Sequence, residues 1–268
     1  MKFIILCLIF VSALISSVVE SPILSVDADN NTVTIKIDKI DVGISGFIVH
    51  SLSPKHNTIL KNVVVKSFDK ENHLAILKMS DYTFLKHKAL PKGKWKVKVG
   101  DRVILAFGYS RAILIAPTEE IYHKITTATK DIQWIHPDMF ATILSLNGHP
   151  TPLKEDFEEL SSSRSIGILF FYINKKMFTL DAKSFTILNI SDAPLVQNQD
   201  ELVLPFYTRV NDIDSNWWGA GSGDLKKYAP HYYELLVESN KKNKKLYNII
   251  KNGDEKLHYL LKEFELKD

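Results

Sequence analysis

The chain has 268 residues, of which 45% are hydrophobic and 24% are charged, and its formal net charge is +3. This balance provides enough apolar side chains for a buried core, and it excludes both an intrinsically disordered chain and a strongly basic nucleic-acid binder. The single cysteine, Cys7, lies in the first hydrophobic segment. A chain that loses this segment therefore has no disulfide, no cysteine metal site and no thiol nucleophile.

The first residues have the pattern of a secretory signal peptide. Lys2 precedes an apolar block over residues 3–15, and small residues follow it at Ser16, Ser17 and Ser21. The block is shorter than the roughly 20 residues that a membrane-spanning helix needs, and it matches the hydrophobic part of a signal peptide. We expect residues 1–20 to be a signal peptide, cleaved between residues 17 and 21. An uncleaved anchor is the alternative, because no small-x-small triplet marks the cleavage site.

Export and composition together indicate a compartment. Exported animal proteins of this size usually contain disulfides, whereas the chain after Cys7 has no cysteine and is rich in lysine, isoleucine and asparagine. We therefore expect a bacterial envelope protein in the periplasm, in the outer membrane or at the cell surface. The sequence leaves its association with a membrane open.

Residues 22–116 have the pattern of short β-strands. Residues 31–38 alternate between apolar and polar side chains, with Val33, Ile35 and Ile37 on one face. Similar runs, separated by turn-forming residues, predict strands over residues 44–50, 59–66, 74–79, 95–99, 103–107 and 112–116. Short strands at this spacing are typical of a closed barrel or a sandwich. The sequence thus predicts a small all-β, barrel-like domain over residues 22–116.

The pattern changes after Pro117. Thr118 is a suitable N-cap for a helix, and two glutamates follow it where the helix dipole favours acidic side chains. Further helices are predicted to begin at Pro137 and after Pro152, and strands over residues 165–173 and 176–181 are predicted to form a hairpin. We expect a mixed α/β subdomain over residues 117–237 and an α+β class for the whole chain.

Residues 238–268 are predicted to be a lysine-rich helical tail. Apolar residues recur at helical spacing from Asp224 onward, and Gly253 divides the pattern into two helices. Within the tail lies a run of lysines: Lys241, Lys242, Lys244 and Lys245. Such a run is typical of a solvated helix face, and an acidic lipid, glycan or protein partner is the alternative interpretation.

The glycine-rich segment over residues 219–223 does not form a catalytic motif. It lacks the spacing of a dinucleotide-binding loop and of a nucleophile elbow, and polar residues precede it instead of a strand. We expect a flexible turn there, with Ser222 or Asp224 capping the next helix.

Three side chains of the metal-binding type lie between residues 136 and 149: His136, Asp138 and His149. Neighbouring prolines and the absence of an H-E-x-x-H motif favour structural roles for them. Paired glutamate and aspartate residues at positions 155–159 are expected to face water on a helix. The sequence therefore predicts no catalytic residue, no metal site and no cofactor.

Aromatic residues near the glycine-rich segment are candidates for a partner interface. Trp217 and Trp218 adjoin this segment, and Tyr232 follows on the next predicted helix. The alternative is that a tryptophan fills the core and the tyrosines pack one helix face.

Five short segments occur in a recognisable order along the chain. They read V-G-D-R-V-I-L at 99–105, R-A-I-L-I-A-P at 111–117, W-I-H-P-D-M-F at 134–140, G-H-P-T-P at 148–152 and P-F-Y-T-R at 205–209. Together they resemble the amino-terminal domain of the bacterial plasminogen-binding protein family, PgbA and PgbB, over residues 22–237. The resemblance implies an exported or surface-exposed, non-enzymatic protein that binds host plasminogen.

The resemblance also implies that lysines are the binding residues. Kringle modules of plasminogen bind a lysine ammonium through acidic residues and prefer a nearby carboxylate. Members of the family continue into a long charged region that ends in lysine, whereas this chain ends Leu266-Lys267-Asp268. The candidate lysines are then Lys267, Lys262 and those of the run at 241–245, and removal of Asp268 would create a terminal lysine.

Two other functions fit the same sequence. One is a structural scaffold of the periplasm, for instance in the flagellar motor, which would dock an envelope protein around Trp217 and Trp218. The other is a hydrolase that uses His136 or His149, which the missing motifs disfavour.

Overall fold

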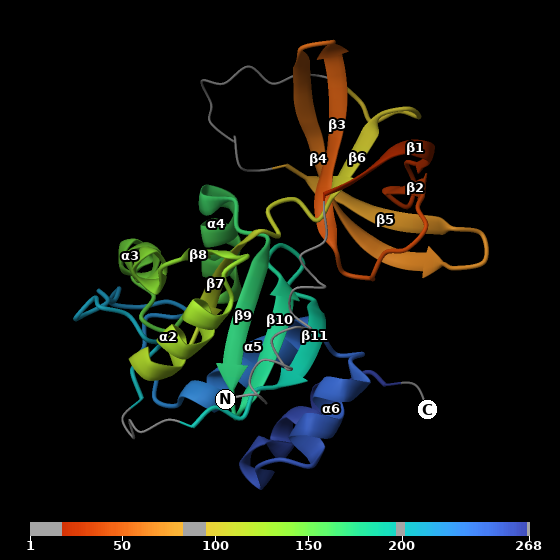
Figure 1. The fold of residues 1–268 in the computed structure, drawn as a ribbon. Coiled ribbons are helices and arrows are strands. Elements are labelled where there is room, and N and C mark those ends of the chain that lie inside the picture. The colour runs from red at the N-terminus through yellow and green to blue at the C-terminus, as the bar shows by residue number, and fades with distance from the viewer. Residues whose placement is uncertain (1–17, 83–94, 197–201, 267–268) are drawn as a thin grey trace. The chain divides into compact units, whose positions relative to one another are not determined.

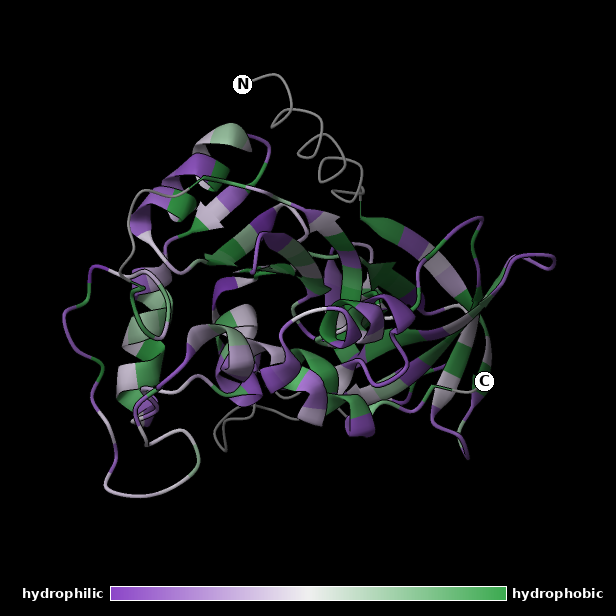
Figure 2. Ribbon diagram, turned by 90° about the horizontal axis from the view of Figure 1, so that it is seen from below, coloured by the Kyte–Doolittle hydropathy of each residue, from purple (hydrophilic) through white to green (hydrophobic). Residues whose placement is uncertain are grey.

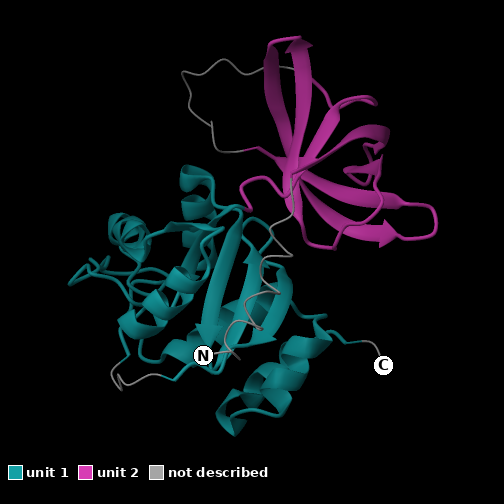
Figure 3. Cartoon of the chain, viewed as in Figure 1, with its two compact units in different colours: residues 1–15, 110–268 teal, residues 16–109 magenta. Residues whose placement is uncertain are grey.

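The computed structural model describes residues 18–82, 95–196 and 202–266. Within this part the chain has an α+β fold with two compact units, one within residues 16–109 and one within residues 110–268 (Figure 3). The predicted fold class is confirmed. Most of the expected signal peptide, residues 1–17, and the candidate Lys267 lie outside the described residues.

Among the described residues of the first unit, antiparallel strands close into a six-stranded barrel (Figure 1). The strands are β1 (Val19–Asp27), β2 (Thr32–Lys36), β3 (Ser45–Ser53), β4 (His56–Asp69), β5 (Leu74–Asp81) and β6 (Arg102–Leu105). They follow one another in the order β1-β2-β5-β4-β3-β6, and β1 also pairs with β6, which closes the barrel.

Alternating side chains fill the barrel. Val33 and Ile35 of β2 point inward and are buried, as the sequence pattern predicts, and Val63, Leu77 and Val103 join them in the core. Gly46 is needed where β3 crosses β6, because a Cβ at this position would lie 2.0 Å from the backbone oxygen of Ile104.

The predicted strands of this unit are largely confirmed, with two differences. Residues 95–99 form no strand: the Lys98 N–H donates to Asp101 Oδ2 at 3.0 Å, and the Asp101 N–H donates to Lys98 O at 3.2 Å, so the chain turns there. The strand that the sequence missed is β1. It begins at Val19, so residues 19 and 20, assigned above to the signal peptide, belong to the barrel.

The second unit contains a five-stranded sheet with helices. Its strands are β7 (Arg111–Ile115), β8 (Gln133–Ile135), β9 (Ile168–Ile173), β10 (Lys176–Asp181) and β11 (Ile187–Asp192), in the order β11-β10-β9-β7-β8. The helices are α2 (Glu119–Ala128), α3 (Pro137–Asn147), α4 (Lys154–Arg164), α5 (Tyr228–Ser239), α6 (Lys244–Lys251) and the 3-10 helix η1 (Glu255–Glu263). The strand predicted at 112–116 is thus β7 of this sheet and does not belong to the barrel.

The sheet of the second unit is buried on both faces. β7 pairs with β8 and β9 in parallel, and all six residues of β9 are buried, which requires cover on each side. α5 runs behind the sheet in Figure 1, and the Tyr228 hydroxyl on this helix donates to Ile115 O and Tyr172 O, each at 3.1 Å. Hydrophobic residues gather on the strands and the inner helix faces, while the connecting loops are mostly hydrophilic (Figure 2).

Helix and turn predictions in this unit are mostly confirmed. Thr118 caps α2 by accepting a hydrogen bond from the Ile121 N–H, and Pro137 is the first residue of α3. Asn174 and Lys175 both have positive φ, as a tight hairpin turn requires. The capping prediction for α5 is wrong, because this helix begins only at Tyr228 and neither Ser222 nor Asp224 caps it.

The carboxy-terminal segment differs from the prediction in the type of its second helix. The helical pattern breaks near Gly253 as expected, but the second piece, η1, is a 3-10 helix. Within the described residues, no helix is long and apolar enough to cross a membrane.

Candidate functional site

The predicted lysine-rich tail is part of the folded second unit. Leu246, Ile250, Leu257 and Leu260 each expose 4% of their surface or less, and they belong to the same core cluster as the sheet. Packing fixes which side chains α6 can present, because a helix that buries one face turns the opposite face to water. The tail therefore displays its lysines from a folded surface.

Most candidate lysines in the described part of the chain are accessible. Lys242, Lys244 and Lys262 are exposed and Lys241 is partly exposed. Within residues 18–82, 95–196 and 202–266 none of these four forms an ion pair. Lys245 differs from them, because its ammonium donates to the backbone oxygen of Ile190.

The end of the chain returns to the lysine run. The Glu265 N–H donates to the backbone oxygen of Lys241 at 2.9 Å. This contact brings the segment with Lys262, Glu263 and Glu265 beside Lys241 and Lys242. We call Lys241, Lys242, Lys244 and Lys262 together the lysine surface. Exposed glutamates and lysines thus occur in the same part of the surface.

The aromatic candidates divide into two groups. Trp217 and Trp218 are 95% and 81% exposed, so neither fills the core. Tyr232 is fully buried, and its hydroxyl donates to Pro205 O at 2.7 Å. Tyr232 is therefore a core residue, as the packing interpretation predicts, and it presents no surface to a partner.

The loop with Trp217 and Trp218 is fastened to the connection between α3 and α4. The Asn216 N–H donates to Gly148 O at 3.0 Å, and the Thr151 N–H donates to Gly221 O at 3.1 Å. Gly148 has φ +68, and a Cβ there would lie 2.2 Å from Asn216 Cγ. The segment G-H-P-T-P at 148–152 therefore forms the contact surface on which this loop packs.

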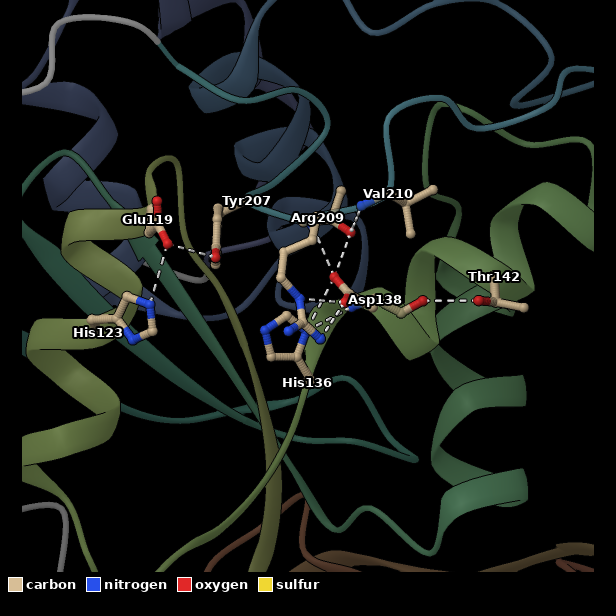
Figure 4. Close-up of polar contacts among 9 residues, drawn as sticks. Glu119, His123, His136, Asp138, Thr142, Tyr207, Arg209 and Val210 are labelled. Atoms are coloured by element: carbon tan, nitrogen blue, oxygen red, sulfur yellow. Dashed lines mark hydrogen bonds and ion pairs between the residues drawn. The ribbon is translucent and has the colours of Figure 1, made fainter.

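Asp138, in the first turn of α3, is the centre of a polar cluster (Figure 4). Its Oδ1 accepts hydrogen bonds from the Thr208 hydroxyl at 2.9 Å and from the Arg209 N–H at 2.8 Å. Its Oδ2 accepts a hydrogen bond from Arg209 Nε at 2.7 Å. The Val210 N–H donates to the Thr208 hydroxyl, and the Thr142 hydroxyl donates to Asp138 O. One carboxylate thus binds α3 to the segment at 208–210, about 70 positions away.

These contacts determine the ionisation of the cluster. Burial opposes the ionisation of Asp138, but hydrogen bonds from Arg209 and Thr208 outweigh it and lower the pKa of this carboxyl. The same hydrogen bond raises the pKa of Arg209. Burial lowers the pKa of His136, and the Asp138 N–H donates to His136 Nδ1 at 3.2 Å. The His136 side chain thus accepts a hydrogen bond at the start of α3, and its Nδ1 also lies 3.1 Å from Asp138 Oδ1.

Aromatic rings pack beside the Asp138 cluster. The ring of Tyr122 lies 5.3 Å from those of both His136 and Tyr207, measured between centroids. The Tyr207 hydroxyl donates to Glu119 Oε1 at 3.1 Å, and His123 Nε2 lies 3.4 Å from the same oxygen. Burial raises the pKa of Tyr122 to about 12, and burial with the Glu119 hydrogen bond raises the pKa of Tyr207. Rings in contact at these distances form a packed group and not an open cage.

The polar groups of this cluster are bonded to one another. The Asp138 carboxylate joins α3 to the segment at 208–210, so the cluster connects two distant chain segments. The sequence drew attention to His136 and Asp138 but missed Tyr207, Thr208 and Arg209 as their partners. Segments 134–140 and 205–209 both belong to the five short segments that resemble the family, and the sequence offered no other sign that they are in contact. In the structure Asp138 of the first segment accepts hydrogen bonds from Thr208 and Arg209 of the second.

His149 belongs to a different cluster. Its Nδ1 lies 2.9 Å from Oδ1 of Asp156, which is 1% exposed. Asp156 Oδ2 also accepts the Leu153 N–H at 2.8 Å, at the start of α4. The three groups considered as metal ligands are thus divided between two clusters. Across the described parts of the chain, no three histidine, cysteine, aspartate or glutamate side chains are grouped to hold a metal ion.

Comparison with known proteins gives one family. A family profile described as "Plasminogen-binding protein pgbA N-terminal" matches residues 18–236. Two curated relatives, each named plasminogen-binding protein PgbA, come from Helicobacter pylori strains J99 / ATCC 700824 and ATCC 700392 / 26695. Each is 28% identical to the chain over 218 residues.

The matched regions are unequal shares of the proteins compared. They cover 81% of this chain and 47% of each relative, so the chain spans about half the length of the curated relatives it matches. No solved structure matches the chain. The profile match begins one residue before β1 and contains the barrel, the sheet and the Asp138 cluster. The chain belongs to the family of the plasminogen-binding protein PgbA amino-terminal region.

Proposed function

We propose that this chain is an exported, non-enzymatic protein of the bacterial envelope or surface that binds host plasminogen through the lysine surface. Membership of the family and the names of the relatives support plasminogen as the partner. The amino-terminal hydrophobic segment supports export. The proposal concerns this chain alone, because the matched relatives are about twice as long.

The main support for plasminogen binding is the composition of the lysine surface. Its lysines have no ion-pair partner among the described residues, and the contact between Glu265 and Lys241 brings exposed carboxylates next to them. A kringle pocket recognises an ammonium on an apolar stem together with a nearby negative charge. Lys245 is excluded from this role, because its ammonium is engaged at β11.

The internal bonding of the titratable groups supports a non-enzymatic role. Asp138 bonds to His136 and to Arg209, and His149 bonds to Asp156. Each of these contacts fixes a loop or a helix start.

Binding to immobilised plasminogen, with and without 6-aminohexanoate as a lysine analogue, tests the proposal. One variant changes the lysine surface to glutamine at Lys241, Lys242, Lys244 and Lys262. The control changes four exposed lysines of the barrel to glutamine, namely Lys36, Lys55, Lys66 and Lys70, and so removes the same charge. We expect the analogue to compete, the first variant to lose at least about tenfold in affinity and the control to bind normally.

Other results would contradict the proposal. Equal loss in both variants would show attraction by net charge alone, and binding no stronger than that of an unrelated protein of similar charge would remove plasminogen as a partner. Deletion of residues 238–268 is unsuitable for this test, because it removes four buried core residues together with the lysines. A chain without Asp268, and the substitution Lys267→Gln, test the terminal lysine separately.

A further inference from the structure

The loop at residues 211–227 presents an apolar tip. Trp217 and Trp218 expose 95% and 81% of their surface, and Leu146 of α3 exposes 81%. Asn216 Nδ2 donates to Asn147 O at 2.7 Å, which places Leu146 and the two tryptophans at one corner of the second unit. Side chains that are this exposed project from the surface. Side chains in a groove or in a flat patch would be partly covered by their neighbours.

The base of this loop is fixed although its tip is exposed. Backbone hydrogen bonds join Asn216 to Gly148 and Thr151 to Gly221, and the Thr151 hydroxyl donates to Gly223 O. Gly148 allows the close approach of Asn216, as described above. These hydrogen bonds therefore fix the position of the loop that exposes Trp217 and Trp218 to solvent. Indole side chains also lose little conformational freedom on binding.

The charges of the loop do not favour an anionic partner. Three aspartates, Asp212, Asp214 and Asp224, lie on it with two lysines, Lys226 and Lys227. The Ser145 hydroxyl on α3 donates to Asp214 Oδ2 at 2.8 Å, so this acidic group lies where the loop contacts α3. Charges of both signs lie on the loop, so the exposed apolar side chains and not a net charge distinguish its tip.

We propose that Trp217, Trp218 and Leu146 insert into the interfacial region of a lipid bilayer. An indole ring suits this region, because its apolar body contacts the acyl chains while its N–H finds acceptors among the headgroups. A bilayer accepts a projecting tip without a preformed groove, which matches the exposure of the rings. The insertion needs no anionic lipid. This inference goes beyond plasminogen binding and does not depend on it.

Binding of protein-free phosphatidylcholine vesicles tests the insertion. The chain is produced from Val18 to Asp268, which keeps all described elements and removes the hydrophobic segment at 3–15, itself a potential lipid binder. Trp217→Ser/Trp218→Ser is compared with Trp95→Ser, which alters a half-exposed tryptophan in the other unit. The readouts are vesicle flotation at about 0.1 M and about 1 M salt, which screen exposed charges to different extents, and fluorescence quenching by brominated lipid.

We expect the unaltered chain and Trp95→Ser to bind at both salt concentrations, with quenching by the brominated lipid. The double variant should lose about tenfold in partitioning for each indole. Leu146→Ser should lower binding less. Plasminogen binding should be the same in all of these variants.

Three outcomes would overturn the inference. The first is no flotation of the unaltered chain, and the second is flotation that the double variant does not change. The third is binding only to anionic vesicles with loss at high salt, which would assign the contact to lysines. Retention of the unaltered chain, but not of the double variant, by envelope proteins in the absence of vesicle binding would assign the tip to a protein partner.

Discussion

Asp138 joins two distant parts of the second unit through one carboxylate. It accepts hydrogen bonds from Thr208 and Arg209, and the first turn of α3 holds it in place. Asn240 has a similar role at the end of α5: its side chain accepts the Ile187 N–H at 2.8 Å and donates to Phe185 O and Leu236 O. Single polar side chains thus hold together segments that are not joined by strand pairing within the sheet.

The first prediction concerns the acid stability of the Asp138 cluster. The folded pKa of Asp138 lies below the unfolded value of about 3.9. The carboxylate therefore contributes stability above about pH 4, and this contribution is lost as the pH falls through the folded pKa. Asp138→Asn should lower the urea midpoint at pH 7 and should weaken the fall in stability below pH 4.

Urea unfolding of both proteins between about pH 7 and pH 2 provides the measurement. Asp212→Asn is the control, because it removes an exposed carboxylate that has no hydrogen bond among the described residues. If Asp138→Asn and the original chain have parallel pH profiles, the carboxylate does not stabilise the fold in the way proposed.

Only part of the Asp138 cluster is predictable from the sequence. His136 and Asp138 were recognisable as polar groups at a helix start, because Pro137 marks the first turn of α3. Their partners Thr208 and Arg209 lie in a segment without regular structure, where periodicity carries no information. Hydrogen bonds between such distant segments depend on the finished fold.

At the scale of elements, α6 and η1 complete the second unit. They cover the core with Leu246, Ile250, Leu257 and Leu260. The tail also protects β11, the edge strand, because the Lys245 ammonium binds Ile190 O and the Asn240 side chain binds the Ile187 N–H. An uncovered strand edge invites pairing with other chains, and these side chains oppose it.

The second prediction therefore concerns the tail. Ile250→Ala should destabilise the second unit by about 2–5 kcal/mol, because the site is buried on all sides and cannot collapse fully. Lys251→Ala, at the next position and exposed, should cost less than about 0.5 kcal/mol. Chemical denaturation of both variants measures the difference. Equal midpoints would mean that the tail is not part of the cooperative unit.

Sequence patterns predicted most elements because burial imposes a period on them. β2 and β5 alternate as expected for strands with one face in a barrel, and α6 follows a helical repeat. The pattern failed for residues 95–99, where a turn held by Asp101 replaces the expected strand. It also failed for β1, because Val19 and Glu20 adjoin a hydrophobic segment and were assigned to it.

At the scale of the whole molecule, the chain folds as two compact units, each with its own core. The barrel depends on residues at the beginning of the described chain. Val19 pairs with Leu105 and Glu20 with Ile104, and Arg102 Nη1 lies 2.9 Å from Glu20 Oε2. A signal peptidase that cut after Glu20 would remove part of this pairing, so a cut before Val19 is the one compatible with the complete barrel.

The third prediction follows from this pairing. A chain that begins at Ile23 lacks the residues of β1 that pair with β6, and its barrel should melt at a clearly lower temperature than that of a chain beginning at Val18. The second unit should keep its own transition in both. Calorimetry on the two chains provides the measurement. Identical barrel transitions would show that the barrel is stable without this closure.

The closed barrel also has a consequence for the order of folding. The ion pair between Glu20 and Arg102 joins residues 82 positions apart, and the strands that carry them are the two that close the barrel. Contacts between such distant residues form slowly, because a long loop must be ordered first. A chain that emerges amino terminus first can therefore pair β1 with β2 early, whereas the other edge of β1 stays unpaired until β6 has followed.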